Sequence, residues 1–376
     1  MKQNKAMSTR AKEREESCEL LGHATHHLPL EDKLTASQSF LRMDISESRY
    51  PPSPEVIESV RSAAERVNEY PDFHSQKLRK ALAEYNKVYP HSIVVGNGSD
   101  EIIDMISRAF LEKEDEILIF VPTYCRYEIS AKIVGARVVK IPSFAGRSYV
   151  LNPEKALSRV SSKTRLIWVC NPNNPTGNLV PEEHILQLLD NSNAIVVVDE
   201  CYFETSRQTS LSLLRKYRKL VIVRSLSKTF CLAGLRVGYA ISNKRLIEKI
   251  QSVKQGFNVN LLAQVGAIAA LKQLDYYNRM WMKLSTERER MARGLSRIGG
   301  VEILPSVTNF LFVNLSKSSK DPKKVYDELV RKRITVLPGW SREFSGRNKS
   351  YLRVLVSTRE DNNTFMKEFA NVLRRI

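Results

Sequence analysis

Short apolar runs alternate with amphipathic segments through the middle of the chain. A continuous apolar run of roughly four to eight residues is typical of a buried strand, whereas apolar residues three and four positions apart are typical of a helix. We expect buried strands at residues 92–95, 117–120, 137–141, 165–170, 194–198 and 220–223. Helical patterns lie between them, for example at residues 102–110 and 181–189. This alternation predicts an α/β fold, with a mostly parallel sheet and helices on both faces.

The pattern changes after residue 274. A long charged helix is expected at residues 275–298, and short strands and a last helix follow it at residues 309–313, 334–336, 351–356 and 361–375. Such an arrangement predicts a smaller α+β domain, completed by a segment before residue 70. We therefore expect a flexible N-terminal arm (1–40), a small domain (41–70 and 275–376) and a large domain (71–274).

The N-terminal arm carries no clear functional signal. It is rich in Lys, Glu, Ser and Thr and contains His23, His26 and His27. No acidic or cysteine partner stands at metal-ligand spacing, so we expect a terminal arm and no metal site. The start lacks the apolar segment of a signal peptide, and no apolar run approaches the roughly 20 residues that span a bilayer. The five cysteines are scattered, which predicts reduced thiols and a cytoplasmic protein.

Composition adds one competing interpretation. The chain has 376 residues, which suggests more than one core, and its formal net charge is +18. A basic protein of this kind can bind nucleic acid or a membrane surface. Here the charge is dispersed, and no helix-turn-helix, zinc-finger or aromatic RNA-binding signature is present. We favour a solvated basic surface, part of which serves an anionic cofactor or substrate.

Polar motifs follow four of the expected strands. They are the Gly-Asn-Gly loop at 96–100, the Asn-rich loop at 171–177, Asp199, and the segment 225–239. In open α/β sheets, ligands bind beyond the carboxyl ends of the strands. The four motifs therefore predict one site.

The segment 225–239 suggests the chemistry of that site. Two hydroxyls, Ser225 and Ser227, stand beside Lys228, and Arg236 follows. Hydroxyls and an arginine suit a phosphate group. A lysine beside a fixed phosphate suits an imine with a carbonyl cofactor. The alternative is a plain polar loop after a strand.

Pyridoxal 5′-phosphate is the aldehyde cofactor that these residues fit. Besides the imine lysine, it needs a phosphate cradle, a carboxylate at its pyridine nitrogen and contacts that hold its ring. The expected cradle consists of Gly98, Ser99, Asp100, Ser225, Ser227 and Arg236. The carboxylate of Asp100 would repel a phosphate, so its backbone amide is expected to matter more.

The remaining contacts to the ring come from the other motifs. Asp199 ends an apolar strand, where a buried carboxylate needs a partner such as a pyridinium; the alternative is an ordinary helix or turn cap. Tyr124 can stack on the ring, and Tyr202 and Asn174 can hydrogen-bond its 3′-oxygen. The alternative for the two tyrosines is a place in the core.

These motifs together resemble the signatures of fold-type I, class I/II pyridoxal-phosphate aminotransferases. The resemblance rests on three segments: Asn171-Pro-Asn-Asn-Pro-Thr-Gly177, Asp199-Glu-Cys-Tyr202, and Ser225-Leu-Ser-Lys228 through Arg236. Segments 44–52, 68–72, 96–101 and 122–124 resemble the histidinol-phosphate aminotransferase branch.

The resemblance implies residue roles and an assembly. It implies catalytic roles for Lys228, Asp199 and Tyr202. It also implies a homodimer whose sites lie at the subunit boundary, where Tyr70 reaches the neighbouring subunit's cofactor phosphate. Arg353 is implied to bind the substrate α-carboxylate.

Two departures bear on the substrate. Ser46-Glu-Ser48 replaces the branch's Asn-Glu-Asn, and Leu337 stands where the branch has a phosphate-binding arginine. We rank amino transfer from histidinol phosphate to 2-oxoglutarate first, with Arg353 and Tyr50 facing the phosphate. Arg342 and Arg347 are candidate replacements for the missing arginine.

Other functions remain open at this point. An aromatic or other amino-acid aminotransferase and a threonine-phosphate decarboxylase-like enzyme share nearly all the motifs. A basic nucleic-acid-binding protein on an inactive aminotransferase scaffold belongs to a different class. The intact Lys228, Asp199 and Arg236 argue against that last function.

Overall fold

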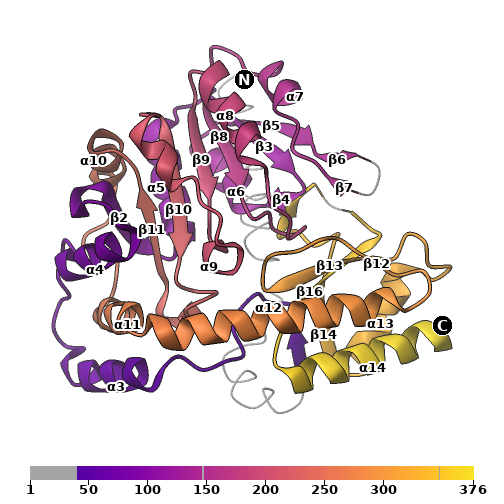
Figure 1. Cartoon of the computed structure of the whole chain (residues 1–376). Coiled ribbons are helices and arrows are strands. Elements are labelled where there is room, and N and C mark those ends of the chain that lie inside the picture. Colours follow the sequence, from indigo (N-terminus) through magenta and orange to yellow (C-terminus); the bar gives the residue numbers. More distant parts are fainter. Residues whose placement is uncertain (1–39, 146–147, 347) are drawn as a thin grey trace, which may run out of the picture.

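The computed structural model describes residues 40–145, 148–346 and 348–376. Nearly all of the expected N-terminal arm, including its three histidines, lies outside the described residues, and so does Arg347. Figure 1 shows the two larger β-sheets with helices around them and one long helix, α12, running past both. Among the described helices, none is long and apolar enough to cross a membrane.

The larger sheet has seven strands. Its order is β2 (Ile93–Asn97), β11 (Val237–Ile241), β10 (Leu220–Ser225), β9 (Ile195–Asp199), β8 (Thr164–Cys170), β3 (Glu116–Val121) and β5 (Arg137–Pro142). Strand β11 runs antiparallel to both of its neighbours, and the remaining pairs are parallel. The expected mostly parallel sheet is thereby confirmed, whereas β11 was not expected as a strand.

Alternate residues of the strands enter two separate cores, as the two-residue period of a strand requires. In β3, Ile117 and Ile119 join one core, whereas Leu118 and Phe120 join the other. Helices α5 (Ser99–Phe110), α6 (Arg126–Ile133) and α10 (Lys244–Ser252) contribute to the first core. Helices α4 (Gln76–Asn86), α7 (Pro153–Leu157), α8 (Glu182–Asn191) and α11 (Leu261–Leu271) contribute to the second. Both faces of the sheet are therefore covered.

The smaller sheet has five strands. Its order is β1 (Leu41–Met43), β14 (Ile334–Pro338), β16 (Tyr351–Leu355), β13 (Phe310–Asn314) and β12 (Glu302–Ile303). Helices α13 (Pro322–Arg331) and α14 (Arg359–Arg375) pack their apolar faces on it. The expected α+β arrangement of the C-terminal part is present, with β1 added from the N-terminal side.

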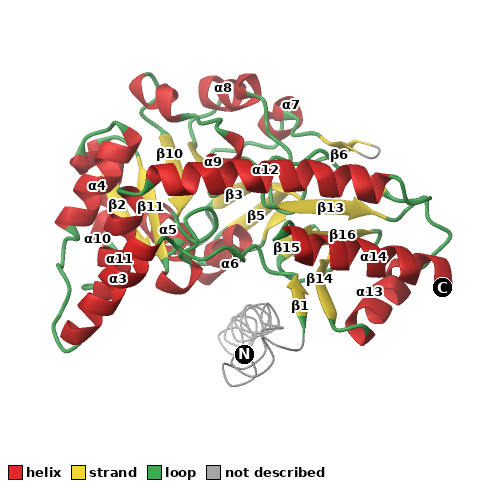
Figure 2. Ribbon diagram, turned by 60° about the horizontal axis from the view of Figure 1, so that its bottom comes forward, coloured by secondary structure: helices red, strands yellow, loops and turns green. Residues whose placement is uncertain are grey.

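Helix α12 (Leu274–Ser296) belongs to both regions, as Figure 2 shows. Its first half places Tyr277 and Trp281 in the core of the large sheet, and its second half places Leu284 and Met291 in the core of the small sheet. Helix α3 (Pro54–Ala63) packs on α11 and is followed by the short turn η1 (Ala64–Arg66). Of the segment 41–70, β1 thus joins the small sheet and α3 lies against the large region.

Short elements complete the fold. Strand β15 (Phe344–Ser345) pairs with β4 (Thr123–Tyr124), and β6 (Phe144–Ala145) pairs with β7 (Ser148–Tyr149). The short helix α9 (Phe203–Ser206) follows β9, and the 3₁₀ turns are η2 (Pro90–Ser92), η3 (Leu211–Arg215) and η4 (Ala233–Leu235). The β15–β4 pair ties a segment of the small region to the end of β3.

Candidate active site

The sheet brings the predicted motifs to one edge. Asp199 is the last residue of β9, and it lies in register with Cys170 at the end of β8 and with Val223 near the end of β10. Gly98 follows β2, and Lys228 follows β10. Because parallel strands end at the same edge, these residues gather there, as expected for a ligand site.

Lys228 is partly buried in the loop after β10. Removal from water lowers the pKa of its amine, and the positive charge of Arg353 lowers that pKa further. No hydrogen bond to its Nζ is found among the described residues. A lysine with a lowered pKa holds more neutral amine at a given pH, and the neutral amine is the nucleophile.

Residues of the expected phosphate cradle lie at the start of α5. Gly98 caps this helix with φ of 82°, and a Cβ at that position would lie 2.5 Å from Nη2 of Arg236. A Cβ on Gly238 would lie 2.3 Å from the carbonyl carbon of Gly98 and from the amide nitrogen of Ser99. The two glycines therefore allow Arg236 and the helix N-terminus to approach each other closely. Free amides at a helix N-terminus favour an anion.

We expect the hydroxyls of the lysine loop to complete this cradle. The Oγ of Ser227 is buried and has no hydrogen-bond partner in the described structure. The Oγ of Ser225 accepts a hydrogen bond from the amide of Ser227 at 3.2 Å. A buried hydroxyl without a partner suits a phosphate group, which would supply the missing acceptor.

The carboxylate of Asp100 is engaged by two other side chains of the site. It accepts a hydrogen bond from Tyr124 Oη at 2.9 Å and one from Arg236 Nη2 at 3.3 Å. These contacts offset its charge, while its amide lies in the first turn of α5. Tyr124 itself is part of β4, where it pairs in register with Phe344.

Asp199 is held by a residue that sequence reasoning missed. Its Oδ2 accepts a hydrogen bond from Tyr127 Oη at 2.6 Å, and its Oδ1 accepts one from the amide of Cys201 at 3.0 Å. Burial raises the pKa of Asp199, and the hydrogen bonds partly oppose the rise. Tyr127 stacks on Trp168, with ring centroids 4.6 Å apart. The two hydrogen bonds fix the orientation of this carboxylate, and its expected partner, a protonated pyridine nitrogen, stays a prediction.

Arg353 reaches the site from β16 of the small sheet. Its Nη1 donates to Asn174 Oδ1 at 2.7 Å, and its Nη2 donates to the carbonyl of Asp44 at 2.8 Å. The guanidinium lies over the rings of Phe310 and Phe344, at 5.1 and 5.4 Å from their centroids. The residue is 4% exposed, and it forms no ion pair with any described residue. A buried cation without a carboxylate is costly, so this arginine suits an anionic ligand.

Two further predicted residues flank this arginine. Tyr202 is buried with its ring edge-on to Phe310, and burial raises the pKa of its hydroxyl while the charge of Arg353 opposes the rise. Leu337 is the cross-strand neighbour of Arg353 on β14, and it is buried. The position expected to carry a second arginine thus presents an apolar side chain beside the first.

Among the described residues, neither Tyr50 nor Tyr70 has a hydrogen bond to this network. Tyr50 is half-buried in the loop after β1 and packs against the core of the large sheet. Tyr70 is 83% exposed, and its ring stacks on Phe257 with centroids 4.5 Å apart. The roles expected for these two tyrosines, and for the other site residues, stay predictions. Arg342 lies in the loop between β14 and β15.

Sequence reasoning also missed Phe344, which forms one wall around Arg353. The two-residue strand that holds it has no periodicity to detect. Tyr127 lies in the segment already noted for Tyr124, but nothing in the sequence shows which of the two hydroxyls meets Asp199. A buried aspartate at a strand end, which needs a donor, was the one available signal.

The chain matches a family and several known proteins. The family model of aminotransferase class I and II matches residues 38–369. A histidinol-phosphate aminotransferase of Thermoanaerobacter pseudethanolicus is 37% identical over 337 residues, which cover 88% of this chain and 93% of that protein. The histidinol-phosphate aminotransferase structure from Clostridium acetobutylicum has a TM-score of 0.81 at 26% identity, covering 89% of this chain and 99% of the other.

A second solved structure resembles the fold and contains the cofactor. It is the histidinol-phosphate aminotransferase of Sinorhizobium meliloti in complex with pyridoxal 5′-phosphate, with a TM-score of 0.83 and 24% identity, covering 95% of this chain and 97% of the other. At that identity the likeness concerns the fold alone. The match over most of the chain and the fit of the cradle agree with the cofactor expected from the sequence. The chain belongs to the class I and II aminotransferases, and its cofactor is pyridoxal 5′-phosphate.

Proposed function

We propose that this chain transfers the amino group of histidinol phosphate to 2-oxoglutarate, with pyridoxal 5′-phosphate joined covalently to Lys228. The convergence of Lys228, Asp199 and the unpaired Arg353 at one sheet edge supports amino transfer. The substrate is supported by relatives of that activity, such as the protein that is 37% identical over most of the chain.

Each residue has a defined task in this proposal. The cradle at Ser99, Ser227 and Arg236 binds the cofactor phosphate. Asp199, oriented by Tyr127, keeps a proton on the pyridine nitrogen. The bound cofactor supplies an electron sink for the substrate carbon next to the amine. The amine of Lys228 moves a proton between its Nζ and that carbon.

Arg353 would bind both substrates in turn. It faces the phosphate of histidinol phosphate in the first half of the reaction and a carboxylate of 2-oxoglutarate in the second. A guanidinium suits either anion because its donors form a planar fork. Tyr50 is proposed to assist at the phosphate.

A donor with an apolar side chain is the second candidate. Buried Leu337 beside Arg353, and Phe344 over it, favour this candidate. The deciding experiment compares kcat/KM for histidinol phosphate, histidinol and phenylalanine, each with 2-oxoglutarate. A phosphate-selective site should use histidinol on the order of 100-fold or more less well, because buried donors go unpaired. Equal use of histidinol and its phosphate, or a preference for phenylalanine, would exclude histidinol phosphate as the main substrate.

The same assay separates two further alternatives. A threonine-phosphate decarboxylase-like enzyme would release carbon dioxide from its substrate and leave 2-oxoglutarate unchanged. A nucleic-acid-binding protein on an inactive scaffold would show no turnover and would bind DNA with a strong dependence on salt. Glutamate formation without carbon dioxide is the expected result.

The role of Lys228 has its own test. Borohydride reduction of the protein loaded with the cofactor, followed by peptide mapping, should place the label on Lys228. The variant Lys228→Ala should bind the cofactor without a reducible link. A label on another lysine would refute the assignment.

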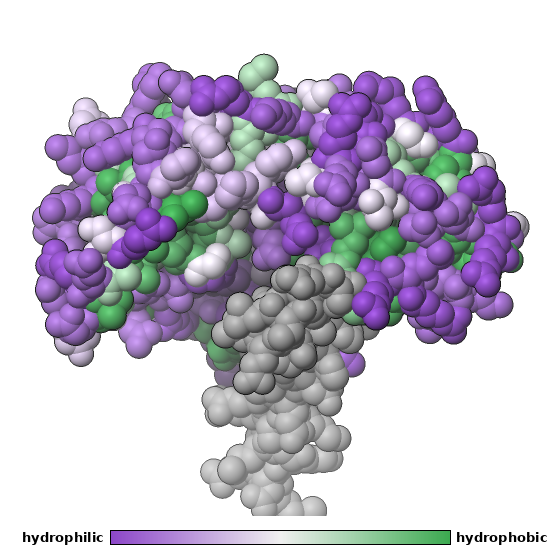
Figure 3. Space-filling model, turned by 90° about the horizontal axis from the view of Figure 1, so that it is seen from below, coloured by the Kyte–Doolittle hydropathy of each residue, from purple (hydrophilic) through white to green (hydrophobic). Residues whose placement is uncertain are grey.

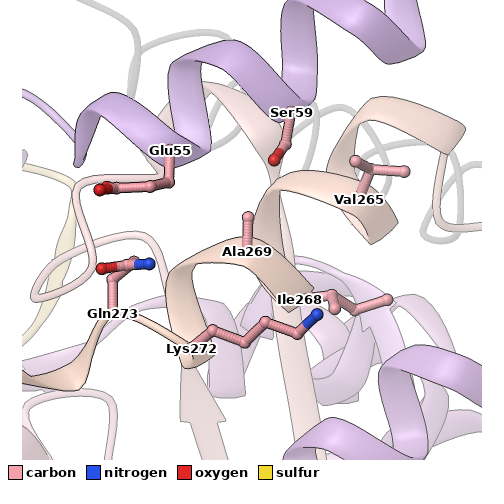
Figure 4. A pocket seen from close by; sticks show the side chains of 7 residues that line it. All are labelled: Glu55, Ser59, Val265, Ile268, Ala269, Lys272 and Gln273. Carbon is pink, nitrogen blue, oxygen red and sulfur yellow. The ribbon is translucent and has the colours of Figure 1, made fainter.

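We further propose a homodimer in which Tyr70 completes the partner's site. Large apolar and aromatic side chains are exposed near Tyr70, namely Val67, Phe73 and Phe257. Figure 3 shows apolar patches, in green, among the polar residues of the lower face. A groove of about 280 Å³ between α3 and α11, lined in part by Val265 and Ile268, also opens on the surface (Figure 4). Exposed apolar area of this kind is typical of an interface.

Mixing two inactive variants tests the shared site. Tyr70→Ala and Lys228→Ala subunits should each have little activity, and the mixed dimer should regain one working site. The control is the mixture of Lys228→Ala with Lys228→Met, which shares no intact site. A monomer in light scattering, or no recovery in the mixture, would contradict the proposal.

A cytoplasmic location is part of the proposal as well. Cys125, Cys170, Cys201 and Cys231 are free thiols. Free thiols are typical of a reducing compartment. Cell fractionation with thiol labelling should find the protein reduced in the cytoplasmic fraction; recovery in an oxidised, secreted fraction would contradict this location.

A further inference from the structure

The residue after Lys228 is fixed by hydrogen bonds at its hydroxyl and at its carbonyl. Thr229 Oγ1 donates a hydrogen bond to Glu204 Oε2 at 2.8 Å. The carbonyl of Thr229 accepts a hydrogen bond from Trp281 Nε1 of α12 at 2.7 Å. Thr229 is 1% exposed and Glu204 is 2% exposed. The backbone on the C-terminal side of the lysine is therefore fixed from two directions.

Glu204 is itself held in place. Its Oε1 accepts a hydrogen bond from Tyr85 Oη of α4 at 3.2 Å. Burial raises the pKa of Glu204, and the positive charge of Arg224 opposes the rise. Arg224 is fixed in turn by an ion pair with Glu200, at 2.8 Å between Nη2 and Oε2. Glu204 thus presents a fixed acceptor to Thr229, because its other carboxylate oxygen is bonded to Tyr85.

Lys228 differs sharply from its neighbour. The described structure offers no hydrogen-bond partner to its Nζ, and its side chain is long and flexible. On the N-terminal side, the amide of Ser227 is bonded to the Oγ of Ser225 at 3.2 Å. The direction in which the lysine leaves the loop is consequently set by the backbone between these two anchors.

The influence of Glu204 on Lys228 is geometric. After removal from water, the largest effects on the pKa of Lys228 come from Arg353, which lowers it, and Asp100, which raises it. Glu204 is not among the groups that mainly shift this pKa. Glu204 therefore affects the position of Lys228 through its hydrogen bond to Thr229.

We propose that the Thr229–Glu204 hydrogen bond positions Lys228, so that its amine meets the aldehyde carbon once the cofactor phosphate is bound. This inference rests on the proposed role of Lys228. In the capture step, Nζ forms a C=N bond with that carbon, and the aldehyde oxygen leaves as water with the two hydrogens of the amine. Misalignment of reacting groups slows such a step more than it weakens binding.

The test uses the apoprotein and two ligands. Stopped-flow absorbance measures the rate of covalent capture of pyridoxal 5′-phosphate. Pyridoxine 5′-phosphate has the same ring and phosphate but no aldehyde, so its Kd reports the cradle alone. Thr229→Val should slow capture on the order of 10- to 100-fold and leave the Kd for pyridoxine 5′-phosphate unchanged. Thr229→Ser, which retains the hydroxyl, should restore the rate.

Two control variants separate positioning from stability and charge. Thr164→Val removes a buried hydroxyl at the other end of β8, which accepts from the amide of Ser161 at 2.9 Å. It should lower Tm without slowing capture. Glu204→Gln removes the charge and keeps one oxygen acceptor for Thr229, while its NH2 group can donate to Tyr85 Oη in place of the second acceptor. This variant should therefore capture the cofactor at nearly the wild-type rate.

The outcomes that overturn the proposal are distinct. The proposed positioning of Lys228 would be refuted if Thr229→Val captured the cofactor at the wild-type rate, or if Thr229→Ser did not restore that rate. It would also be refuted if Thr229→Val lost affinity for pyridoxine 5′-phosphate in parallel with its capture rate. If Thr229→Val does not fold, Trp281→Phe removes the other anchor and should show the same pattern. Capture at the wild-type rate by Lys228→Ala would instead refute the proposed role of Lys228, which is a separate result.

Discussion

The two sides of the site are held by different means. On the cofactor side, Asp199 and the loop of Lys228 are fixed by polar partners within the large region, such as Tyr127 and Glu204. On the other side, Arg353 comes from the small sheet and is held by one amide, one carbonyl and two phenyl faces. The first arrangement specifies one ligand geometry closely. The second leaves a buried cation that has no carboxylate partner among the described residues, so we expect its specificity for an anion to depend on its apolar neighbours.

This difference predicts which side of the site tolerates substitutions. Asn174 belongs to the large region and Arg353 to the small one, so their hydrogen bond depends on how the two regions lie. Buried polar networks lose much when one member is removed. We therefore expect the cofactor side to be intolerant of substitution and the Arg353 side to adapt to a different substrate.

The largest effect is expected from Asp199→Ala. Without the carboxylate, the pyridine nitrogen is not kept protonated, and kcat should fall on the order of 100- to 1,000-fold, as for loss of a preorganised electrostatic contact. Cofactor stoichiometry, measured by absorbance after alkaline release, should stay near that of the wild type. Near-normal turnover in this variant would remove Asp199 from the mechanism.

Arg353→Lys should have the next largest effect. Lysine lacks the planar fork of donors, so kcat/KM should fall about 10- to 100-fold, chiefly through a higher KM. Steady-state kinetics with varied amino donor and with varied 2-oxoglutarate measure this. A loss confined to kcat would instead place Arg353 on the cofactor side of the comparison.

Tyr127→Phe sharpens the comparison from the cofactor side. It removes the hydrogen bond to Asp199 and keeps the ring stacked on Trp168, so kcat should fall about tenfold, the value of one hydrogen bond to a charged group. The KM for the amino donor should not change. Tyr326→Phe, on the small-sheet side, is the matched control and should leave kcat unaltered.

The smallest expected effect is on the pH dependence of the free energy of unfolding of the apoprotein. The pKa of Lys228 is lowered from 10.5 in the folded chain, so the unfolded chain binds more protons at alkaline pH just below 10.5. The free energy of unfolding should therefore gain a contribution from Lys228 as pH rises toward 10.5. Denaturant unfolding of the wild type and of Lys228→Met at several pH values measures it. The free energy of unfolding of the wild type should rise with pH relative to that of Lys228→Met. If the two free energies keep a constant difference, the lysine has the same pKa in the folded and unfolded chain.

Much of the fold could be predicted because local pattern and tertiary placement agree. The runs at 117–120, 165–170 and 220–223 are buried on both faces, which an apolar run signals directly. Strand β11 was missed because Gly238 and Tyr239 belong to a segment recognised for its chemistry. Its antiparallel direction is set by its neighbours β10 and β2, which no local pattern reveals.

The sequence predicted which residue types form the candidate site, but it did not predict which side chains these residues contact. Lys228, Asp199 and Arg353 are chemically unusual where they stand, so their positions in the sequence carried a signal. Tyr127, Glu204 and Phe344 are ordinary residues whose importance arises only from what they touch. Contacts between distant segments depend on the whole packing, and sequence patterns do not encode them individually.

Helix α12 has a consequence for how the molecule unfolds. Its 23 residues supply Trp281 to one core and Met291 to the other. If either half of α12 leaves its core, apolar surface is exposed there. The backbone hydrogen bonds of the helix, which continue into the other half, are weakened as well. The two regions are therefore expected to melt cooperatively as one unit, with coincident transitions for probes placed in either sheet.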